Sequence, residues 1–238
     1  MSGSVRLDRL LANLGYGSRN EVQQLVRRGV VMLDGARAED ASQRIALSAD
    51  LPARLTIGGD VLDPLPGMAL MLHKPLGVTC SHKEAGPLVY DLLPARWRRR
   101  EPTLSTVGRL DKESSGLLLL TDDGALLHRL TSPKSHFPKV YEVGCKHPVD
   151  ARQVTQLIEG VMLKDEKTPV RAAACEIVDE RTLRLTLTEG KYHQVKRMLA
   201  AVANRVETLH RSAFGALTLP ADLAPGEWRW LEGPEVLS

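Results

Sequence analysis

One stretch of the sequence decides how the chain is interpreted: Gly108-Arg-Leu-Asp-Lys-Glu-Ser-Ser-Gly-Leu-Leu-Leu-Leu-Thr-Asp-Asp-Gly124. Its first part predicts a turn that displays Arg109 and Asp111. The four consecutive leucines predict a buried strand at 116–120. The Gly at its start lets another chain segment approach closely. The stretch therefore predicts a rigid turn that leads into the core of a sheet.

Two carboxylates of this stretch are candidates for particular roles. Asp122 or Asp123 stands where a helix N-cap is needed. Asp111, on a rigid turn beside a cationic group, would stay ionised and could attack an electrophilic carbon. The alternative is that Asp111 only forms the turn or a surface ion pair.

Short apolar runs and helical patterns alternate on both sides of this stretch. Strands are predicted at 69–73, 116–120, 139–145, 171–178, 182–188 and 205–209. Helices are predicted at 87–93, 124–131, 150–159 and 192–203. Short connections between several strands indicate an α+β domain with a mixed, mainly antiparallel sheet flanked by helices.

The first residues of the chain predict a separate, small helical domain. Leucines at 7, 10, 11 and 14 follow helical spacing, and Ser18 with Glu21 forms the pattern of a capping box. A short strand at 30–33 ends at an Asp-Gly turn. Two prolines and a glycine at 62–67 indicate a linker. The predicted division is 1–61 for the small domain, 62–67 for the linker and 68–238 for the larger domain.

Composition excludes several classes of protein. The chain has 238 residues, 43% of them hydrophobic, and its 32 basic and 29 acidic side chains give a net charge of +3. This balance excludes a histone-like binder and an acidic disordered chain. The charge is nevertheless uneven, because residues 1–38 carry six basic and three acidic groups and residues 191–211 carry five and one. Both segments are candidate RNA-facing surfaces.

Motifs for metals, cofactors and membranes are missing from the sequence. The three cysteines are far apart, and no CxxC pair or pair of histidines at ligand spacing begins a metal site. No apolar run reaches the length of a signal peptide core or a membrane span. A protein of the cytoplasm without metal is expected.

The order of residues from Arg6 to Gly35 resembles the S4-like RNA-binding domain, whose two helices present basic side chains to the RNA backbone. The resemblance implies phosphate contacts that position RNA without reading its sequence. The side chains implied are Arg6, Arg9, Arg19, Arg27 and Arg28. A second run, Arg96, Arg98, Arg99 and Arg100, either contacts RNA or is a solvated surface.

The larger domain resembles the pseudouridine synthases of the RsuA/RluB/RluE/RluF group. The segment 108–124 is similar to their catalytic signature. Three further matches stand in the family's order: His73-Lys-Pro-Leu-Gly77, Lys139-Val-Tyr-Glu-Val143 and Glu189-Gly-Lys-Tyr-His-Gln-Val-Lys-Arg-Met198. With the S4-like segment, the resemblance covers nearly the whole chain.

This resemblance implies roles for individual residues. Asp111 corresponds to the nucleophile, Tyr141 to the tyrosine that packs on the target base, and Lys196 to the cation that holds the carboxylate ionised and aimed. In the substrate pocket, Leu209 corresponds to an apolar residue of the uracil site and Arg109 to a contact with the RNA backbone. Lys74 and Arg197 are further expected RNA contacts. Without the resemblance, Tyr141 and Leu209 would be interpreted as core residues and Lys196 as a solvated one.

The implied reaction is isomerisation of uridine to pseudouridine in ribosomal RNA, most closely 16S rRNA or an assembling small subunit, by a monomer. The reaction needs no cofactor. The carboxylate assists by attack at the sugar, by attack at the base or by proton abstraction, and the sequence leaves these open. Three alternatives remain: a large-subunit 23S rRNA enzyme of the same group, a non-catalytic RNA-binding or ribosome-assembly factor, and a glycosidase that uses Asp111 with Asp122 or Asp123.

Overall fold

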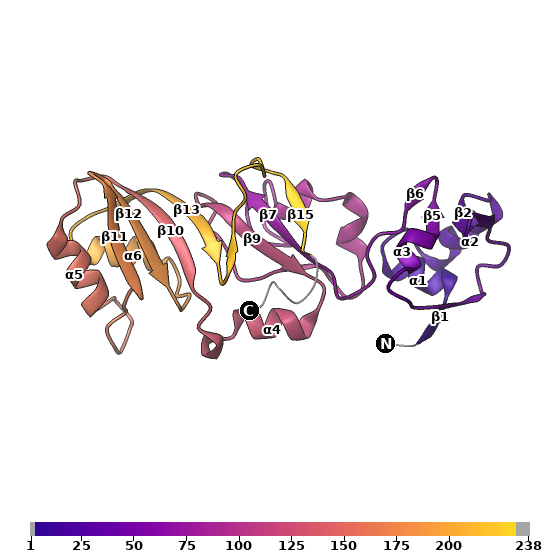
Figure 1. Ribbon diagram of the computed structural model, residues 1–238, viewed down its shortest axis with the longest axis horizontal. Coiled ribbons are helices and arrows are strands. Elements are labelled where there is room, and N and C mark those ends of the chain that lie inside the picture. Colours follow the sequence, from indigo (N-terminus) through magenta and orange to yellow (C-terminus); the bar gives the residue numbers. More distant parts are fainter. Residues whose placement is uncertain (1–2, 232–238) are drawn as a thin grey trace. The chain divides into compact units, whose positions relative to one another are not determined.

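The computed structural model describes residues 3–231, which divide into two compact units (Figure 1). The first unit comprises the chain up to Met68 together with Leu93–Ser105 and Thr121–Gly124. The second comprises Ala69–Leu92, Thr106–Leu120 and the chain from Ala125 onward. The first unit therefore includes two short segments, 93–105 and 121–124, that lie far along the sequence from its main part.

The first unit contains three helices and two small sheets among its described residues. The helices are α1 (Leu7–Asn13), α2 (Arg19–Arg27) and α3 (Leu51–Arg54). One sheet pairs β1 (Ser4–Arg6) with β4 (Arg44–Ala46); the other has the order β3 (Ala36–Arg37), β2 (Val31–Leu33), β5 (Leu55–Ile57), β6 (Asp60–Val61). The predicted leucine stripe of α1 is buried in a core shared with Val22 and Val26 of α2.

Local sequence explains how these elements begin and end. The predicted capping box is present, since Ser18 Oγ accepts from the Glu21 amide and Glu21 Oε2 accepts from the Ser18 amide. The predicted Asp-Gly turn joins β2 to β3, and both of its residues have positive φ, 52° at Asp34 and 76° at Gly35. This conformation matches the twist of a hairpin. Gly15 ends the first helix, where a Cβ would meet the Arg96 carbonyl oxygen.

A buried ion pair holds the segment 64–68 in the first unit. Arg100 Nη2 lies 2.8 Å from Asp122 Oδ2 and also donates to the Pro64 carbonyl, and both charged residues are buried. The amides of Gly67 and Met68 donate to the other oxygen of Asp122. Asp122 thus stabilises the connection before the first strand of the large sheet, and Asp123 is the residue that directly precedes α4 (Gly124–Thr131).

Replacement of Asp122 by alanine is expected to destabilise the protein by about 3–5 kcal/mol, because the Arg100 guanidinium would stay buried without its counter-charge. Urea unfolding followed by circular dichroism measures this loss. Asp34→Ala is the matched control, because Asp34 pairs with Arg54 at the surface, with half of its side chain exposed. A loss for Asp122→Ala no larger than that of the control would contradict this interpretation.

The second unit is built on a mixed sheet of nine strands in the described part of the chain. The main path runs in the order β11-β12-β10-β13-β9-β7-β15, with β14 paired to β13 and β8 to β9. Figure 1 shows α5 and α6 near the β11 end of this sheet and α4 below β9. The strands are β7 (Ala69–Lys74), β8 (Ser105–Thr106), β9 (Ser115–Thr121), β10 (Lys139–Cys145), β11 (Ala174–Asp179), β12 (Thr182–Leu187), β13 (Val206–Phe214), β14 (Leu217–Thr218) and β15 (Trp228–Trp230). The helices α5 (Ala151–Glu159) and α6 (Gln194–Ala201) complete the α+β arrangement that the sequence predicted.

The predicted elements differ from the structure mainly at their ends. The segment predicted as a helix at 87–93 is a 3₁₀ turn at Val89–Leu92, and two further 3₁₀ turns lie at Ala95–Arg99 and Pro133–Ser135. The strand predicted at 205–209 continues to Phe214. This extension has a consequence for the site, because it carries Arg211 into the sheet.

The contact between β9 and β13 confirms the expected role of Gly116. These two strands pair in parallel, with Gly116 opposite Arg211. Gly116 has a φ of 114°, and a Cβ at this position would lie 2.3 Å from the Arg211 carbonyl oxygen. No other residue type allows the two backbones to approach so closely. The glycine thereby fixes the turn that precedes β9 against the neighbouring strand.

Candidate active site

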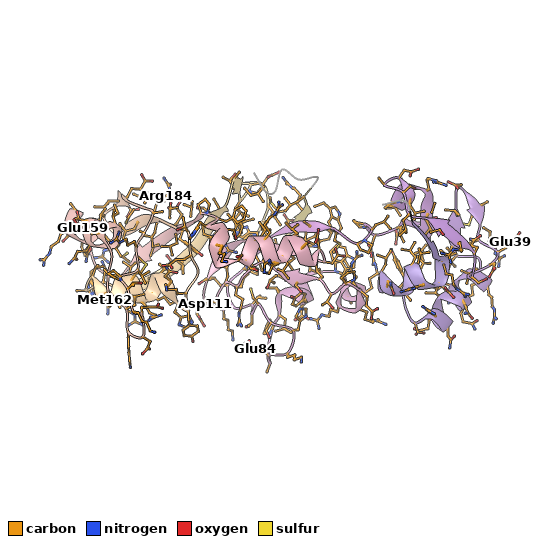
Figure 2. The ribbon with its side chains drawn as sticks, turned by 90° about the horizontal axis from the view of Figure 1, so that it is seen from below. Glu39, Glu84, Asp111, Glu159, Met162 and Arg184 are labelled. Carbon is orange, nitrogen blue, oxygen red and sulfur yellow. The ribbon has the colours of Figure 1, made fainter. Side chains whose placement is uncertain are left out.

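A cavity of about 830 Å³ opens in the second unit at the turn that carries Asp111. Five of the residues that the sequence indicated contribute to its wall: Arg109, Asp111, Tyr141, Lys196 and Leu209. They come from the turn before β9, from β10, from α6 and from β13. Figure 2 labels Asp111, which lies on the same side of that view as Glu84. Residues far apart in the sequence therefore meet in one place.

Backbone contacts hold the Asp111 turn. The Ser114 amide donates to the Asp111 carbonyl, and the Gly77 amide donates to the Lys112 carbonyl. Lys74 is completely buried, and its Nζ donates to the carbonyls of Ser114, at 2.7 Å, and Pro75. Burial lowers the pKa of Lys74 from its ordinary value. The ammonium group therefore stabilises the turn from inside the protein through these hydrogen bonds.

Two basic side chains from the start of α6 face the Asp111 carboxylate. Lys196 Nζ lies 3.3 Å from Asp111 Oδ2, and His193 Nε2 lies 3.5 Å from the same oxygen. The Asp111 side chain is 31% exposed, so it is open to a substrate while its orientation is restrained. Lys196 also lies 3.5 Å from Glu113, a more exposed carboxylate of the same turn. A hydrogen bond with its own backbone lowers the pKa of the Glu113 carboxyl, and the neighbouring Lys196 lowers it further.

His193 reaches this position because of its backbone. Its φ of 47° and ψ of 36° are left-handed, and it stands at the N-cap of α6. The turn at 191–194 is closed by Gln194, whose side-chain oxygen accepts from the Lys191 amide. The His193 ring stacks on Tyr192, with ring centroids 3.9 Å apart, and Tyr192 is 78% exposed at the cavity wall. The motif thus places an aromatic surface beside the carboxylate.

The wall opposite the turn is formed by the sheet. Tyr141 of β10 and Leu209 of β13 are both buried in the protein and line the cavity. Lys139, Leu187 and Arg211 line it as well. This wall combines an aromatic ring, aliphatic groups and two cations, and it is suited to a planar polar ring.

Arg109 lies at the exposed edge of the cavity. Its guanidinium is 3.4 Å from Glu84, and both side chains are more than half exposed. An exposed ion pair of this kind contributes little to stability. Arg109 is therefore available for an RNA backbone, as the resemblance implied.

The structure separates the expected RNA contacts into three groups. Arg6, Arg9, Arg19, Arg27 and Arg28 are exposed on the first unit, with Arg6 paired to Asp8. Arg197 is half-buried and bound to Glu166 and to the carbonyls of Tyr192 and Lys164. Lys74 is the third case, and here the expectation was wrong, because a fully buried ammonium that braces the turn cannot contact RNA at the surface.

The arginine run that follows Pro94 divides in the same way. Arg98 and Arg99 are exposed. Arg96 forms two 2.7 Å hydrogen bonds with Asp63, and Arg100 is buried against Asp122. The possibility that all four contact RNA is thereby corrected, since Arg100 is enclosed and Arg96 stabilises the first unit.

The glycosidase alternative loses its second carboxylate. Neither Asp122 nor Asp123 is among the described residues that line the cavity, and Asp122 is buried with Arg100 as its counter-ion. Within residues 3–231, no three His, Cys, Asp or Glu side chains are grouped so that they could hold a metal ion. In the same range, no helix is long and apolar enough to cross a membrane.

Three residues of the site were missed by sequence reasoning. His193 lay within a matched motif, but its left-handed backbone carried no sequence signal that separated it from the helix. Lys139 also lay within a matched motif, two residues before Tyr141, and period-two alternation indicates that the two share a face. Arg211 was missed because the predicted strand ended at 209.

Comparison with known proteins agrees with this geometry. Residues 69–201 match the family of RNA pseudouridylate synthases, and residues 5–51 match the S4 domain. An uncharacterised RNA pseudouridine synthase of Bacillus subtilis is 42% identical over 98% of this chain and 97% of its own length. Ribosomal small subunit pseudouridine synthase A of Escherichia coli is 39% identical over 98% of this chain and 99% of its own. A solved structure described as a pseudouridylate synthase superposes with a TM-score of 0.67, at 35% identity and with 98% of both chains covered.

Proposed function

The chain belongs to the RNA pseudouridylate synthase family, and we propose that it converts a uridine of small-subunit 16S rRNA to pseudouridine with Asp111 as the catalytic carboxylate. The observation that carries this proposal is the Asp111 carboxylate at an open cavity, 3.3 Å from Lys196 and facing a sheet wall that contains Tyr141. The named relatives that act on the small ribosomal subunit support the choice of RNA.

The residues at the cavity fit the requirements of this isomerisation. The bond between uracil N1 and ribose C1′ must break, the uracil must turn, and its C5 must bond to C1′. The carboxylate assists the cleavage, and Lys196 and His193 keep it aimed. Tyr141 and Leu209 offer a wall on which the detached ring can lie. The cavity confines the ring during its rotation.

The N-terminal and C-terminal parts of the sequence divide the work. We propose that residues 1–61 bind the RNA backbone, that 62–67 form a linker and that 68–238 perform the chemistry. A target uridine in folded RNA must be turned out of its stack, at a cost of a few kcal/mol. Contacts between exposed arginines and phosphates offset that cost. We further propose that the protein acts as a monomer in the cytoplasm, and sedimentation of the purified protein tests the monomer.

One experiment tests the proposed function. Pseudouridines are mapped in the rRNA of cells that lack the protein, and a single uridine of 16S rRNA is expected to stay unmodified. Re-expression of the wild-type chain should restore the modification, and re-expression of Asp111→Asn should not. Loss of a 23S site instead would identify the large-subunit alternative, and an unchanged map would contradict an enzymatic role in rRNA modification.

The exposed arginines of the first unit lead to a prediction about salt. Arg19→Gln combined with Arg28→Gln is expected to weaken binding of 16S rRNA and to lower the slope of log affinity against log salt by about 1 for each lost phosphate contact. Filter binding at several salt concentrations measures this slope. Arg152→Gln on α5, which removes an exposed charge of the other unit, is the matched control. An unchanged slope in the double variant would remove these arginines from the RNA interface.

A further inference from the structure

Two cations line the cavity without a carboxylate partner. None of the ion pairs found among the described residues involves Lys139 or Arg211, although both belong to the cavity wall. Lys139 Nζ donates to the Phe137 carbonyl at 3.0 Å, and Arg211 Nε donates to the Leu117 carbonyl at 2.7 Å. Carbonyl oxygens orient these groups, but they do not neutralise them.

Arg211 shows most clearly that a partner is missing. The residue is only 2% exposed, and its Nη2 is a buried donor with no hydrogen bond. A buried charged group without a partner is costly and is uncommon in folded proteins. Because Arg211 lines the active-site cavity, a substrate atom within reach of its guanidinium would relieve this cost.

The register of the sheet places both cations beside the expected base-binding residues. Tyr141 of β10 lies directly opposite Arg211 of β13, and Lys139 precedes Tyr141 by two positions on the same strand; the register shifts between Val140 and Tyr141, so that Lys139 lies opposite Phe214. Residues two apart share a face, and cross-strand neighbours have Cβ atoms about 5 Å apart. The two cations also lie over one ring, with Lys139 Nζ 5.5 Å and the Arg211 guanidinium carbon 5.6 Å from the centroid of Phe214. Lys139 and Arg211 together form the cationic floor of the cavity.

Asp111 does not require this floor, because its carboxylate already has Lys196 and His193 within 3.5 Å. The cavity therefore contains a carboxylate with its own basic neighbours and, separately, two cations that can meet negative charge on a substrate. Burial lowers the pKa of Lys139 and the nearby Arg211 lowers it further, while Glu189 at the cavity wall opposes this shift without forming an ion pair with Lys139 among the described residues. An anionic group held between these two side chains would relieve their mutual repulsion.

We propose that Lys139 and Arg211 bind the carbonyl oxygens of the extruded uracil and stabilise the negative charge that the ring gains while it is detached from ribose. This inference rests on the proposed function and adds a chemical role for two residues. When the N1–C1′ bond breaks, its electron pair stays on uracil and spreads to the O2 and O4 oxygens. When C5 then bonds to C1′, the C5 proton leaves to solvent and N1 takes up a proton, so atoms and charge balance. Attack on the base instead of the sugar would also place negative charge on a carbonyl oxygen.

The decisive variant is Lys139→Met. Lys139 is only half-buried, and methionine keeps an aliphatic side chain of similar length while it removes the charge. Single-turnover release of tritium from C5-labelled 16S rRNA is measured at saturating enzyme, together with RNA affinity and thermal stability. The expected result is a rate about 10²-fold below wild type or lower, as for the loss of a group that stabilises an oxyanion. RNA affinity is expected to stay within about threefold of wild type, because the lysine acts inside the cavity.

Conservative and control variants separate charge from structure. Lys139→Arg should recover most of the rate, since it returns a cation to the floor. Lys146→Met removes an exposed lysine just after the same strand and is expected to react like wild type. Arg211→Lys keeps the positive charge but removes the planar guanidinium, which contains the unpartnered Nη2. This variant should have a lower single-turnover rate. If Arg211→Lys does not fold, Lys139→Met alone decides the question.

Two outcomes would overturn the proposal. A Lys139→Met rate within threefold of wild type would show that the floor does not stabilise the detached base. A defect that is present at subsaturating enzyme and disappears at saturating enzyme would show that Lys139 binds a phosphate instead. Either result requires an active wild-type enzyme, so each is distinct from failure of the proposed function, in which wild type itself releases no tritium from rRNA.

Discussion

Asp111→Asn is expected to lower the single-turnover rate of pseudouridine formation by about 10⁴-fold or more, as the loss of an essential nucleophile or base does in other enzymes. The substitution keeps the shape of the side chain and removes its charge. Lys196 and His193, at 3.3 and 3.5 Å, would then face a neutral amide. Glu113, a carboxylate of the same turn, does not take over, because it is directed to Lys196 and is 71% exposed. Release of tritium from C5-labelled 16S rRNA measures the loss.

Glu113→Gln is the matched control for this variant. It removes a carboxylate that lies on the same turn and contacts the same lysine. Because Glu113 is largely exposed, the effect on the rate should be about tenfold or smaller. Binding of 16S rRNA to Asp111→Asn should stay close to wild type, since a single partly exposed charge is changed. Tritium release at the wild-type rate by Asp111→Asn would refute the assignment of the catalytic carboxylate.

Features with a local physical cause were predicted well from the sequence. The Ser18–Glu21 capping box, the Asp34-Gly35 hairpin turn and the close approach at Gly116 follow from side-chain reach or backbone freedom over a few residues. The meeting of Asp111 with Lys196 was expected only through the resemblance, because their distance depends on how β9 and α6 are placed in the whole domain.

Features that depend on tertiary packing were not predictable in the same way. Lys74 was expected to contact RNA, and Arg100 was expected either to contact RNA or to be solvated, yet each is buried where it satisfies backbone carbonyls or a carboxylate. Charged residues are rarely buried without such partners. Arg211 was missed because the predicted strand ended at 209. In the structure the strand continues, since β10 and β9 pair with it on both sides.

Lys196→Met is the second substitution with a large expected effect. The methionine keeps the length and the aliphatic packing of the side chain but removes the cation that lies 3.3 Å from Asp111. The carboxylate would retain His193 as a basic neighbour at 3.5 Å, and its orientation toward the substrate would be less fixed. Loss of one such preorganised electrostatic contact lowers the rate of chemistry by about 10²–10³-fold. Single-turnover tritium release at saturating enzyme measures this rate separately from binding.

The position of Lys196 implies that the defect lies in chemistry and not in affinity. Its ammonium is engaged by Asp111 and Glu113 and is only 32% exposed, so it has little freedom to reach a phosphate. Lys196→Arg should therefore recover part of the rate, because the guanidinium can meet the same carboxylate. RNA affinity of Lys196→Met should stay within about threefold of wild type, as for an interaction made mainly in the transition state. A loss confined to affinity, with a normal rate at saturation, would instead make Lys196 a phosphate contact and leave His193 as the residue that positions Asp111.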